Sequence, residues 1–500
     1  MSFSLLAKKL DITSGGDKIV LLHESVALEH GIHAGDHIIV SGKGYPETLC
    51  IVDTTDSSIE KHHIGLYREV WEPLGIHANV EILLALAVPS LAVGYIKKKI
   101  KKENLTYEEI YAIMEGIVSG KLGLIEKTYF LTTIYNPGYS KEELYFLTKA
   151  MAETGAMLQF GDKVVDKHSI GGYAGKGITP LVVAIAASYG LKVPNTSSRS
   201  ITTPAGTTDM LETIMPISFP KEKLEGLMQD IGAFLVWGGG LNLAPADEEL
   251  IRIERPLGVE SNDKFIVSIL AKKVAMGVTH LLIDIPAGIE GKIQLESEID
   301  EIERKFKEIG ERFNMQITVV RRYPKGIDGN GVGPILEMRE VLYVFENSPL
   351  KSKQLENDAV RLAGMLLEIA SIAESNGGEY MAREALKSGK AYAKFKEIVK
   401  KQGGKTHIAS ADFTPKAKEL SFKSAITGEI TFLHNHKVIA LARLLGCPLD
   451  HHAGIYFSKK EGDTVKIGDR LFTIYTTTED RFALATAYLQ KEKLFDIVPD

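Results

Sequence analysis

The sequence predicts an α/β multidomain protein: a helical domain plus an α/β domain built on a parallel sheet, with small β-rich N-terminal and C-terminal domains. Three observations predict this arrangement. Short apolar runs separated by glycine-containing turns fill both ends of the chain, as in β-rich domains. Capping-box starts, each followed by apolar residues at helical spacing, come after the first of these regions. Beyond Gly161, strand-like and helical stretches alternate, which is typical of a parallel sheet with crossover helices.

The composition is that of an ordinary globular protein. Of 500 residues, 44% are hydrophobic and 25% are charged, which excludes a disordered or collagen-like chain. The net charge of −6 argues against a general nucleic-acid-binding protein. Cys50 and Cys447 lie far apart and outside any cluster of metal ligands, so neither a disulfide framework nor structural zinc is expected. Without a signal-peptide pattern or a long apolar stretch, the protein is expected to be cytoplasmic and not associated with a membrane.

The β-rich N-terminal domain is predicted over residues 1–80. Its strand-like runs are Lys18–Leu22, His37–Val40, Leu49–Val52 and Ile64–Tyr67. The helical domain is predicted over 81–158, where Thr106 and Ser140 each stand three residues before a glutamate. This spacing is that of a capping box, and apolar residues at helical spacing follow both.

The α/β domain is predicted over residues 159–345. Its expected strands are Val164–Asp166, Leu281–Ile285 and Ile317–Val320, and its expected helices are Leu181–Ser188, Lys221–Asp230 and Ile299–Phe313. The last predicted domain, 346–500, is α+β with a β-rich end. There the pairs Gly462-Asp463 and Gly468-Asp469 mark turns between short apolar runs.

A segment directly after the first strand of the α/β domain, Asp166–Gly172, has the composition of a phosphate-binding loop. Its glycines let the backbone approach a ligand, while Lys167 and Ser169 supply a charge and a donor. Parallel sheets bind ligands at the carboxyl ends of their strands. The glycines that follow do not make a nucleotide P-loop, because their spacing is one residue short and Gly177 replaces the required serine or threonine. His168 is interpreted as a structural histidine rather than a general base.

Two further segments concentrate polar side chains that a core does not need. Thr196–Thr207 holds seven hydroxyl residues and one arginine, Arg199. A planar guanidinium among hydroxyls suits phosphate oxygens, and a polar surface loop is the alternative. Ser268 and Lys272 lie four residues apart in an apolar run, so they share one face of a helix. An exposed stripe on an amphipathic helix is the alternative there.

Taken in order along the chain, these segments resemble the thymidine/pyrimidine-nucleoside phosphorylase family, and most closely its archaeal-type AMP phosphorylase branch. The resemblance extends over essentially the whole chain. It is carried by Lys167–Gly172, Ser197–Thr207, Leu243–Asp247, Ile253–Leu257, Ser268-x-x-x-Lys272 and Ile283–Pro286. Several ordered motifs in one chain are more specific than any one of them alone.

The resemblance implies an enzyme, a pentosyltransferase that cleaves an N-glycosidic bond with inorganic phosphate. It implies a cleft between the helical and α/β domains, with residues 245–275 completing the helical domain. It also implies no metal and no organic cofactor, with phosphate as co-substrate, and a homodimer or larger homo-oligomer. Such a reaction requires a held anion, an oriented ribose and a proton for the departing base.

The resemblance also assigns site residues. It implies that Lys167, Ser169, Ser197 and Thr207 hold the attacking phosphate, and that Glu260 donates the proton. The nucleotide site that it implies is Gly172, Ser198, Arg199, Ser200, Ile201, Thr202, Thr203, Thr207, Ser268 and Lys292, with Lys272 one helical turn from Ser268. Arg199 is suited to a 5′-phosphate, a group that nucleosides do not carry.

Two positions depart from the family pattern. Pyrimidine phosphorylases place a base-reading arginine fifteen residues before the helical serine, where this chain has Ile253, flanked by Arg252 and Arg255. A register shift that brings Arg252 or Arg255 to the base is one alternative, whereas the simpler interpretation weakens pyrimidine specificity and favours AMP. The AMP branch has an aspartate eight residues before that serine, where this chain has Glu260. The carboxylic acid is kept, but displacing a proton donor by about an ångström can lower the rate strongly; Asp263 is the reserve donor.

The predicted function is therefore AMP phosphorolysis to adenine and ribose 1,5-bisphosphate in nucleotide salvage or catabolism, with CMP and UMP as further substrates. A thymidine/pyrimidine-nucleoside phosphorylase is the first alternative. A non-catalytic nucleotide-binding protein is the second, favoured only by the glutamate at the donor position. A phosphoribosyltransferase on a similar scaffold is the weakest, because no Asp-rich magnesium–pyrophosphate motif is evident.

Overall fold

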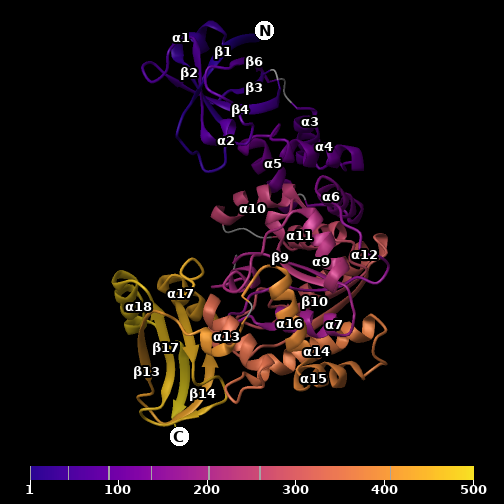
Figure 1. Cartoon of the computed structure of the whole chain (residues 1–500), viewed down its shortest axis with the longest axis vertical. Helices are drawn as coiled ribbons and strands as arrows, with labels where there is room; N and C mark the ends of the chain where they lie inside the picture. The colour runs from indigo at the N-terminus through magenta and orange to yellow at the C-terminus, as the bar shows by residue number, and fades with distance from the viewer. Residues whose placement is uncertain are drawn as a thin grey trace. The chain divides into compact units, whose positions relative to one another are not determined.

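The computed structural model describes residues 2–42, 44–87, 90–136, 138–200, 203–257, 261–405 and 407–499. The chain divides into two compact units, Met1–Pro137 and Gly138–Asp500, whose helices and strands are labelled in Figure 1. In the described ranges, no helix is both long enough and apolar enough to cross a membrane.

Six strands of the first unit form a closed barrel in the order β1-β5-β2-β4-β3-β6. They are β1 (Ser2–Lys9), β2 (Ile19–His23), β3 (His37–Gly42), β4 (Tyr45–Thr55), β5 (His63–Leu66) and β6 (Glu81–Leu86). The predicted runs are β2 to β5. The expected change to helix at residue 81 is wrong, because buried Ile82 and Leu84 alternate with exposed neighbours, which is the period of a strand. Since β6 pairs with β1 and β3, the barrel extends past residue 80.

Helices make up the rest of the first unit. They are α1 (Glu24–Glu29) and α2 (Arg68–Trp71) beside the barrel, then α3 (Leu91–Ile100), α4 (Tyr107–Val118) and α5 (Leu124–Tyr135). α3 packs against both α4 and α5. The capping box expected at Thr106 is present: its hydroxyl accepts from the Glu109 N–H, and the Glu109 carboxylate accepts from the Thr106 N–H.

Five parallel strands of the second unit form two sheets, β11-β10-β7 and β8-β9, and an isolated parallel bridge between Val164 and Lys192 joins them in the order β11-β10-β7-β8-β9. They are β7 (Val165–Ser169), β8 (Val193–Ser197), β9 (Ala233–Trp237), β10 (His280–Pro286) and β11 (Gln316–Arg322). β10 and β11 match the predicted strands, whereas β8 and β9 are additional. β7 overlaps the predicted strand Val164–Asp166 but continues to Ser169, so Lys167 and Ser169 lie in the strand and not in the loop after it. The apolar pattern of β8 is interrupted by Asn195 and Thr196, which are buried because both belong to a polar network.

Helices pack around this sheet (Figure 1). The connecting helices are α7 (Ile178–Ser188), α8 (Thr207–Leu211), α9 (Lys221–Ile231) and α12 (Glu296–Arg312), followed later by α14 (Lys353–Ile369), α15 (Gly378–Lys387) and α16 (Lys390–Lys401). α14, α15 and α16 all pack against α7, and α14 and α16 also contact strands of the sheet. The predicted boundary at residue 346 therefore separates these three helices from the sheet that they cover.

A helical layer borders the same sheet. It consists of α6 (Lys141–Glu153), which begins with the expected capping box at Ser140, α10 (Pro245–Leu257) and α11 (Asn262–Ala275). α6 packs against both α10 and α11. Residues 245–275 thus lie beside a helix from the predicted helical domain.

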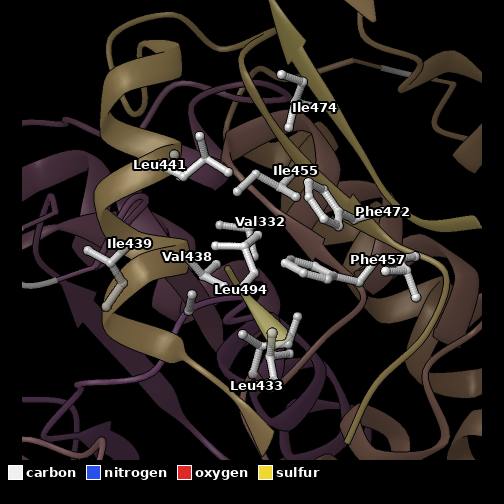
Figure 2. Packing of buried hydrophobic residues seen from close by; sticks show 14 of the residues in the cluster. Val332, Leu433, Val438, Ile439, Leu441, Ile455, Phe457, Phe472, Ile474 and Leu494 are labelled. Carbon is white, nitrogen blue, oxygen red and sulfur yellow. The ribbon is translucent and has the colours of Figure 1, made fainter. Parts of the chain in front are cut away.

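The C-terminal part contains two antiparallel sheets, β12-β15-β17-β13 and β16-β14-β18. Its elements are β12 (Gly331–Val332), α13 (Pro334–Phe345), β13 (Lys418–Lys423), β14 (Gly428–Leu433), α17 (Asn435–Leu445), β15 (Gly454–Phe457), β16 (Thr464–Val465), β17 (Arg470–Thr476), α18 (Glu479–Lys491) and β18 (Phe495–Pro499). Figure 2 shows Leu441 of α17 meeting Ile455 and Phe472 of the first sheet in one apolar core. Gly462 and Gly468 mark turns, as expected, and both have positive φ.

Candidate active site

A cavity of about 660 Å³ lies at the carboxyl ends of the parallel strands of the second unit. Each of the five strands contributes a residue from its last positions: Ser169, Ser197, Trp237, Asp284 and Arg322. Residues of α10 and α11 complete the lining. This is the edge at which open parallel sheets bind ligands, because loops from several strands diverge there.

Most of the predicted site residues line this cavity. They are Lys167, Ser169, Ser197, Ser198, Arg199, Thr203, Thr207, Ser268, Lys272 and Lys292. Gly172 and Ser200 stand next to lining residues in the chain. Ile201, Thr202 and Glu260 lie outside the described residues. Three segments that are far apart in the sequence therefore reach a single cavity.

Lys167 is a buried cation near the end of β7. Its Nζ donates to the Thr179 hydroxyl at 3.5 Å and lies 3.7 Å from Asp284 Oδ2. Thr179 belongs to the first turn of α7, where unpaired backbone N–H groups and the helix dipole favour negative charge. Burial lowers the pKa of Lys167, although Asp284 opposes this effect. A cation beside a helix N-terminus is an arrangement that suits an oxyanion.

Arg322, at the end of β11, holds the carboxylate of Asp284, which lies beside Lys167. Its Nε lies 2.9 Å from Asp284 Oδ1, and its Nη1 lies 2.7 Å from Asp328 Oδ1 and 3.1 Å from Asp358 Oδ2. Burial opposes the charge of Arg322, but the neighbouring acids raise its pKa well above the ordinary value. Because carboxylates surround it, Arg322 acts as a positioning group for Asp284.

A second polar network lies under β7 and β8. Lys273 of α11 donates to Asp166 Oδ2 at 2.5 Å and to Thr196 Oγ1 at 3.1 Å, and Asn195 Nδ2 donates to Asp166 Oδ1 at 2.6 Å. These side chains are almost fully buried. Since the two charges of the network pair with each other, it holds the ends of two strands and α11 together.

His168 lines the cavity. Burial and the positive charges of Lys273 and Lys167 lower its pKa well below the ordinary value. Because a lowered pKa makes a weaker base, these surroundings do not favour His168 as a general base.

Asp247 of α10 organises the predicted pair Ser268 and Lys272. Its oxygens accept from Lys264 Nζ at 2.6 Å, from the Ser268 hydroxyl at 2.6 Å and from Lys272 Nζ at 2.8 Å. Burial would raise the pKa of Asp247, but the two ammonium groups outweigh it and hold the pKa well below its usual range. Ser268 and Lys272 do share one helix face, and a buried carboxylate fixes both.

The predicted hydroxyl-rich loop is folded around Asp209. Asp209 Oδ2 accepts from the backbone N–H groups of Ser200 and Gly206, both at 2.8 Å. Arg199 donates through both terminal nitrogens to Glu212, at 2.7 and 2.9 Å, and also to Asp209 at 3.3 Å. Its guanidinium therefore lines the cavity while it is held by two acids. The alternative of a simple polar surface loop does not describe this segment, because most of it lines the cavity or is buried.

Glycine at position 172 permits close contact between two loops. Gly172 has φ of 107°, and a Cβ there would stand 2.8 Å from the backbone nitrogen of Lys292. Lys292 Nζ lies 4.5 Å from the centre of the Phe265 ring. Asn435, the first residue of α17, donates to the Gly172 carbonyl at 2.7 Å and accepts from the Ala174 N–H at 3.0 Å. The C-terminal part thus supports the glycine loop directly.

Asp263 and Ile253, which the sequence singled out, both lie outside the described lining of the cavity. Asp263, the reserve proton donor, is paired with Lys305 at 2.6 Å and is not among the described residues of the lining. Ile253 is buried outside that lining, whereas the preceding Arg252 is part of it and lies 3.2 Å from Glu249.

Several lining residues were not singled out from the sequence. They are Lys176, Thr179, Asn195, Trp237, Glu248, Lys264, Lys273, Asp284, Arg322, Asp328 and Arg443. A usable signal exists for some of them: Asp284 interrupts an apolar strand, and Lys264 and Lys273 interrupt an apolar helix. Charged residues are almost never fully buried unless they are paired, so such interruptions indicate a polar network. Within the described ranges, no group of three or more His, Cys, Asp or Glu side chains is arranged to hold a metal ion.

Three family models match the chain in order. The helical bundle domain of a glycosyl transferase family matches residues 93–155, the a/b domain of that family matches 161–285, and the pyrimidine nucleoside phosphorylase C-terminal domain matches 430–494. The AMP phosphorylase of Methanocella arvoryzae is 36% identical over 478 residues, which cover 95% of this chain and 94% of the relative. That of Methanospirillum hungatei is 37% identical over 486 residues, or 96% and 93% of the two chains. This chain belongs to the AMP phosphorylase family.

The AMP phosphorylase family relationship confirms the resemblance carried by the sequence motifs. The relative from Methanocaldococcus jannaschii agrees with it, at 36% identity over 94% of this chain and 93% of its own length. Among solved structures, the chain is similar to anthranilate phosphoribosyltransferase (TrpD) from Thermus thermophilus, with a TM-score of 0.52 and 20% identity. The match covers 62% of this chain and 99% of that one, and it shows a shared fold.

Proposed function

We propose that this protein catalyses the phosphorolysis of AMP. An oxygen of inorganic phosphate attacks C1′ of the ribose, the C1′–N9 bond breaks, and adenine leaves with one added proton, giving ribose 1,5-bisphosphate. The single observation that carries the proposal is the meeting of the Lys167 loop, the Arg199 loop and the Ser268 helix in one cavity. Their order and chemistry match what the family's reaction needs: an anion site, a sugar site and charge compensation.

The attacking phosphate is assigned to the ends of β7 and β8 and the starts of α7 and α8. Lys167, Ser169, Ser197 and Thr207 line the cavity from strand ends and a helix start. An ammonium and hydroxyl donors hold the anion and orient one oxygen toward C1′. Because Lys167 is buried, its attraction for a dianion is screened less than in water.

The nucleotide is assigned to the lining residues contributed by α10 and α11. Ser268 is held by Asp247 at 2.6 Å, so its hydroxyl oxygen is presented to the cavity as an acceptor in a fixed place. Glu260 is proposed as the proton donor to the base, a role for which a carboxylic acid is suited. Lys272 lies 3.1 Å from Glu248 as well as against Asp247, so we infer that it positions these acids.

Arg199 is proposed to recognise the 5′-phosphate. A guanidinium has five N–H donors, and Glu212 and Asp209 accept from its terminal nitrogens. A phosphate dianion at this position would compete with Glu212 for the same donors. The proposal therefore includes an exchange of Glu212 for phosphate on Arg199 when AMP binds.

Pyrimidine substrates are the second candidate, and one observation favours them. The base-reading arginine expected for a pyrimidine phosphorylase is replaced by Ile253, but Arg252 lines the cavity. A substrate panel separates the candidates: AMP, CMP, UMP, adenosine and thymidine are each incubated with protein and phosphate, and free base and sugar phosphate are quantified. AMP is expected to react fastest. Release from thymidine with none from any 5′-monophosphate would reverse the assignment.

The substrate panel, combined with a binding measurement, tests whether the protein binds AMP without cleaving it. Tight AMP binding in a calorimeter without turnover at high phosphate would identify a non-catalytic nucleotide-binding protein. The reaction is proposed to need phosphate but no metal and no organic cofactor. A run with a chelator tests the first absence, and a run with extensively dialysed protein tests the second. A cytoplasmic location and a homodimer or larger homo-oligomer also belong to the proposal, and sedimentation measures the latter.

A further inference from the structure

Lys176 lines the cavity and, among the described residues, has no ion-pair partner. In the described part of the chain, no carboxylate oxygen lies within 4.0 Å of its Nζ and no hydrogen bond to that atom is formed. The neighbouring cations differ: Lys273 lies 2.5 Å from Asp166, and Arg322 contacts three aspartates. An enclosed charge without a partner is unfavourable, and a bound anion removes the penalty.

The backbone directly before Lys176 is held against a second loop. Ala174 O accepts from the Asp328 N–H at 3.0 Å, and Gly175 O accepts from the Gly329 N–H at 2.9 Å. A Cβ on Gly175 would stand 2.9 Å from Gly329 N, so the two loops touch. Lys176 follows directly, two residues before the first residue of α7.

The charges around Lys176 are mixed. Burial lowers its pKa to about 8; Asp328, Glu337 and Asp284 favour the charged form, and Lys167 opposes it. Glu337 is a weak contributor, because its own burial raises its pKa well above the ordinary value. Lys167 and Lys176 repel one another across the loop between β7 and α7, and an anion between them converts that repulsion into attraction.

We propose that Lys176 is a further ligand of the attacking phosphate and neutralises it together with Lys167. The inference deepens the proposed function and rests on it, since it adds a residue to the same anion site. The inorganic phosphate is favoured over the 5′-phosphate because Lys176 lies on the connection to α7 that directly follows β7, the strand that carries Lys167 and Ser169.

Phosphate binding in a calorimeter, with no nucleotide present, tests the assignment directly. Lys176→Met is expected to weaken phosphate binding roughly 10- to 100-fold, the usual effect of losing a charge-assisted contact. Lys176→Arg should stay within a few-fold of wild type. Lys223→Met removes an equal charge from an exposed position on α9 and should change nothing.

The kinetic arm uses AMP phosphorolysis, with KM for phosphate and KM for AMP measured separately. Lys176→Met should raise KM for phosphate and leave the preference for AMP over adenosine unchanged. In wild type, KM for phosphate should rise more steeply above about pH 8 than in Lys176→Arg, whose guanidinium stays charged.

Three outcomes would overturn the inference. Unchanged phosphate binding in a folded Lys176→Met variant would show that the residue does not contact the anion. A rise in KM for AMP alone would assign Lys176 to the 5′-phosphate. Equal losses in Lys176→Met and Lys176→Arg would indicate a structural role. Because the calorimetric arm needs no turnover, it reads the anion site even if the protein does not cleave AMP.

Discussion

Asp247→Asn removes the carboxylate that holds three side chains of α11. Asp247 is fully buried and accepts from Lys264 at 2.6 Å, Ser268 at 2.6 Å and Lys272 at 2.8 Å. Removing one partner of a buried ion pair typically costs about 3–5 kcal/mol. Each lysine keeps a second carboxylate in the variant: Lys264 lies 3.3 Å from Glu254, and Lys272 lies 3.1 Å from Glu248. We therefore expect a loss at the lower end, about 3 kcal/mol in the free energy of unfolding.

Urea unfolding of wild type and variant measures this loss as a lower midpoint at unchanged slope. The two lysines hold the pKa of Asp247 far below its usual range, so the carboxylate stabilises the folded state above the unfolded pKa of about 4. That stability disappears only as the pH falls through the folded pKa, and the difference between the proteins should be constant from about pH 6 to pH 9.

The control is Asp230→Asn, which removes an exposed ion pair with Lys401 and should leave the midpoint unchanged. Asp247→Asn should also raise KM for AMP, because Ser268 loses the group that fixes it. Equal shifts of the urea midpoint in Asp247→Asn and Asp230→Asn would refute the inference that the buried ion pairs of Asp247 stabilise the fold more than an exposed pair does.

Three other changes test separate parts of the site. Lys167→Ala should raise KM for phosphate strongly while AMP affinity without phosphate, measured by calorimetry, changes little; equal losses would mean that the anion pocket is misassigned. Arg199→Ala should reduce activity toward AMP more than toward adenosine, whereas Glu212→Gln should increase the preference for AMP; a constant ratio in both would contradict the exchange on Arg199. Asn435→Ala removes contacts at 2.7 and 3.0 Å and should lower stability by about 1–3 kcal/mol and raise KM for phosphate; an effect on stability alone would limit it to a structural role.

The elements with clean periodicity are those that the sequence predicts well. The strands β10 and β11 contain apolar runs, the apolar pair Val164-Val165 leads into β7, and helices such as α4 begin at recognisable capping boxes. β8 is missed because Asn195 and Thr196 place polar groups at its buried positions. β6 is missed because most of its residues are apolar, so the sequence shows no alternation. Only the burial of Ile82 and Leu84 between exposed neighbours reveals the two-residue period of a strand.

The site follows the same division. The residues of the motifs reach one cavity, since glycine, hydroxyl and charged residues cluster where strands end. The ion-pair partners of these residues could not be predicted. Arg199 pairs with Glu212 and Asp263 pairs with Lys305, and both pairs depend on how helices pack, which no local sequence pattern encodes.

Asn435 has a consequence for the order in which the molecule is built. Its amide clasps the carbonyl of Gly172 and the N–H of Ala174, more than 260 residues earlier in the chain. Domains fold from the N-terminus during synthesis, so a nascent chain can assemble the parallel sheet well before this clasp exists. The contacts of Asn435 with Gly172 and Ala174 can form only after α17 has been synthesised, and a chain truncated before α17 lacks them.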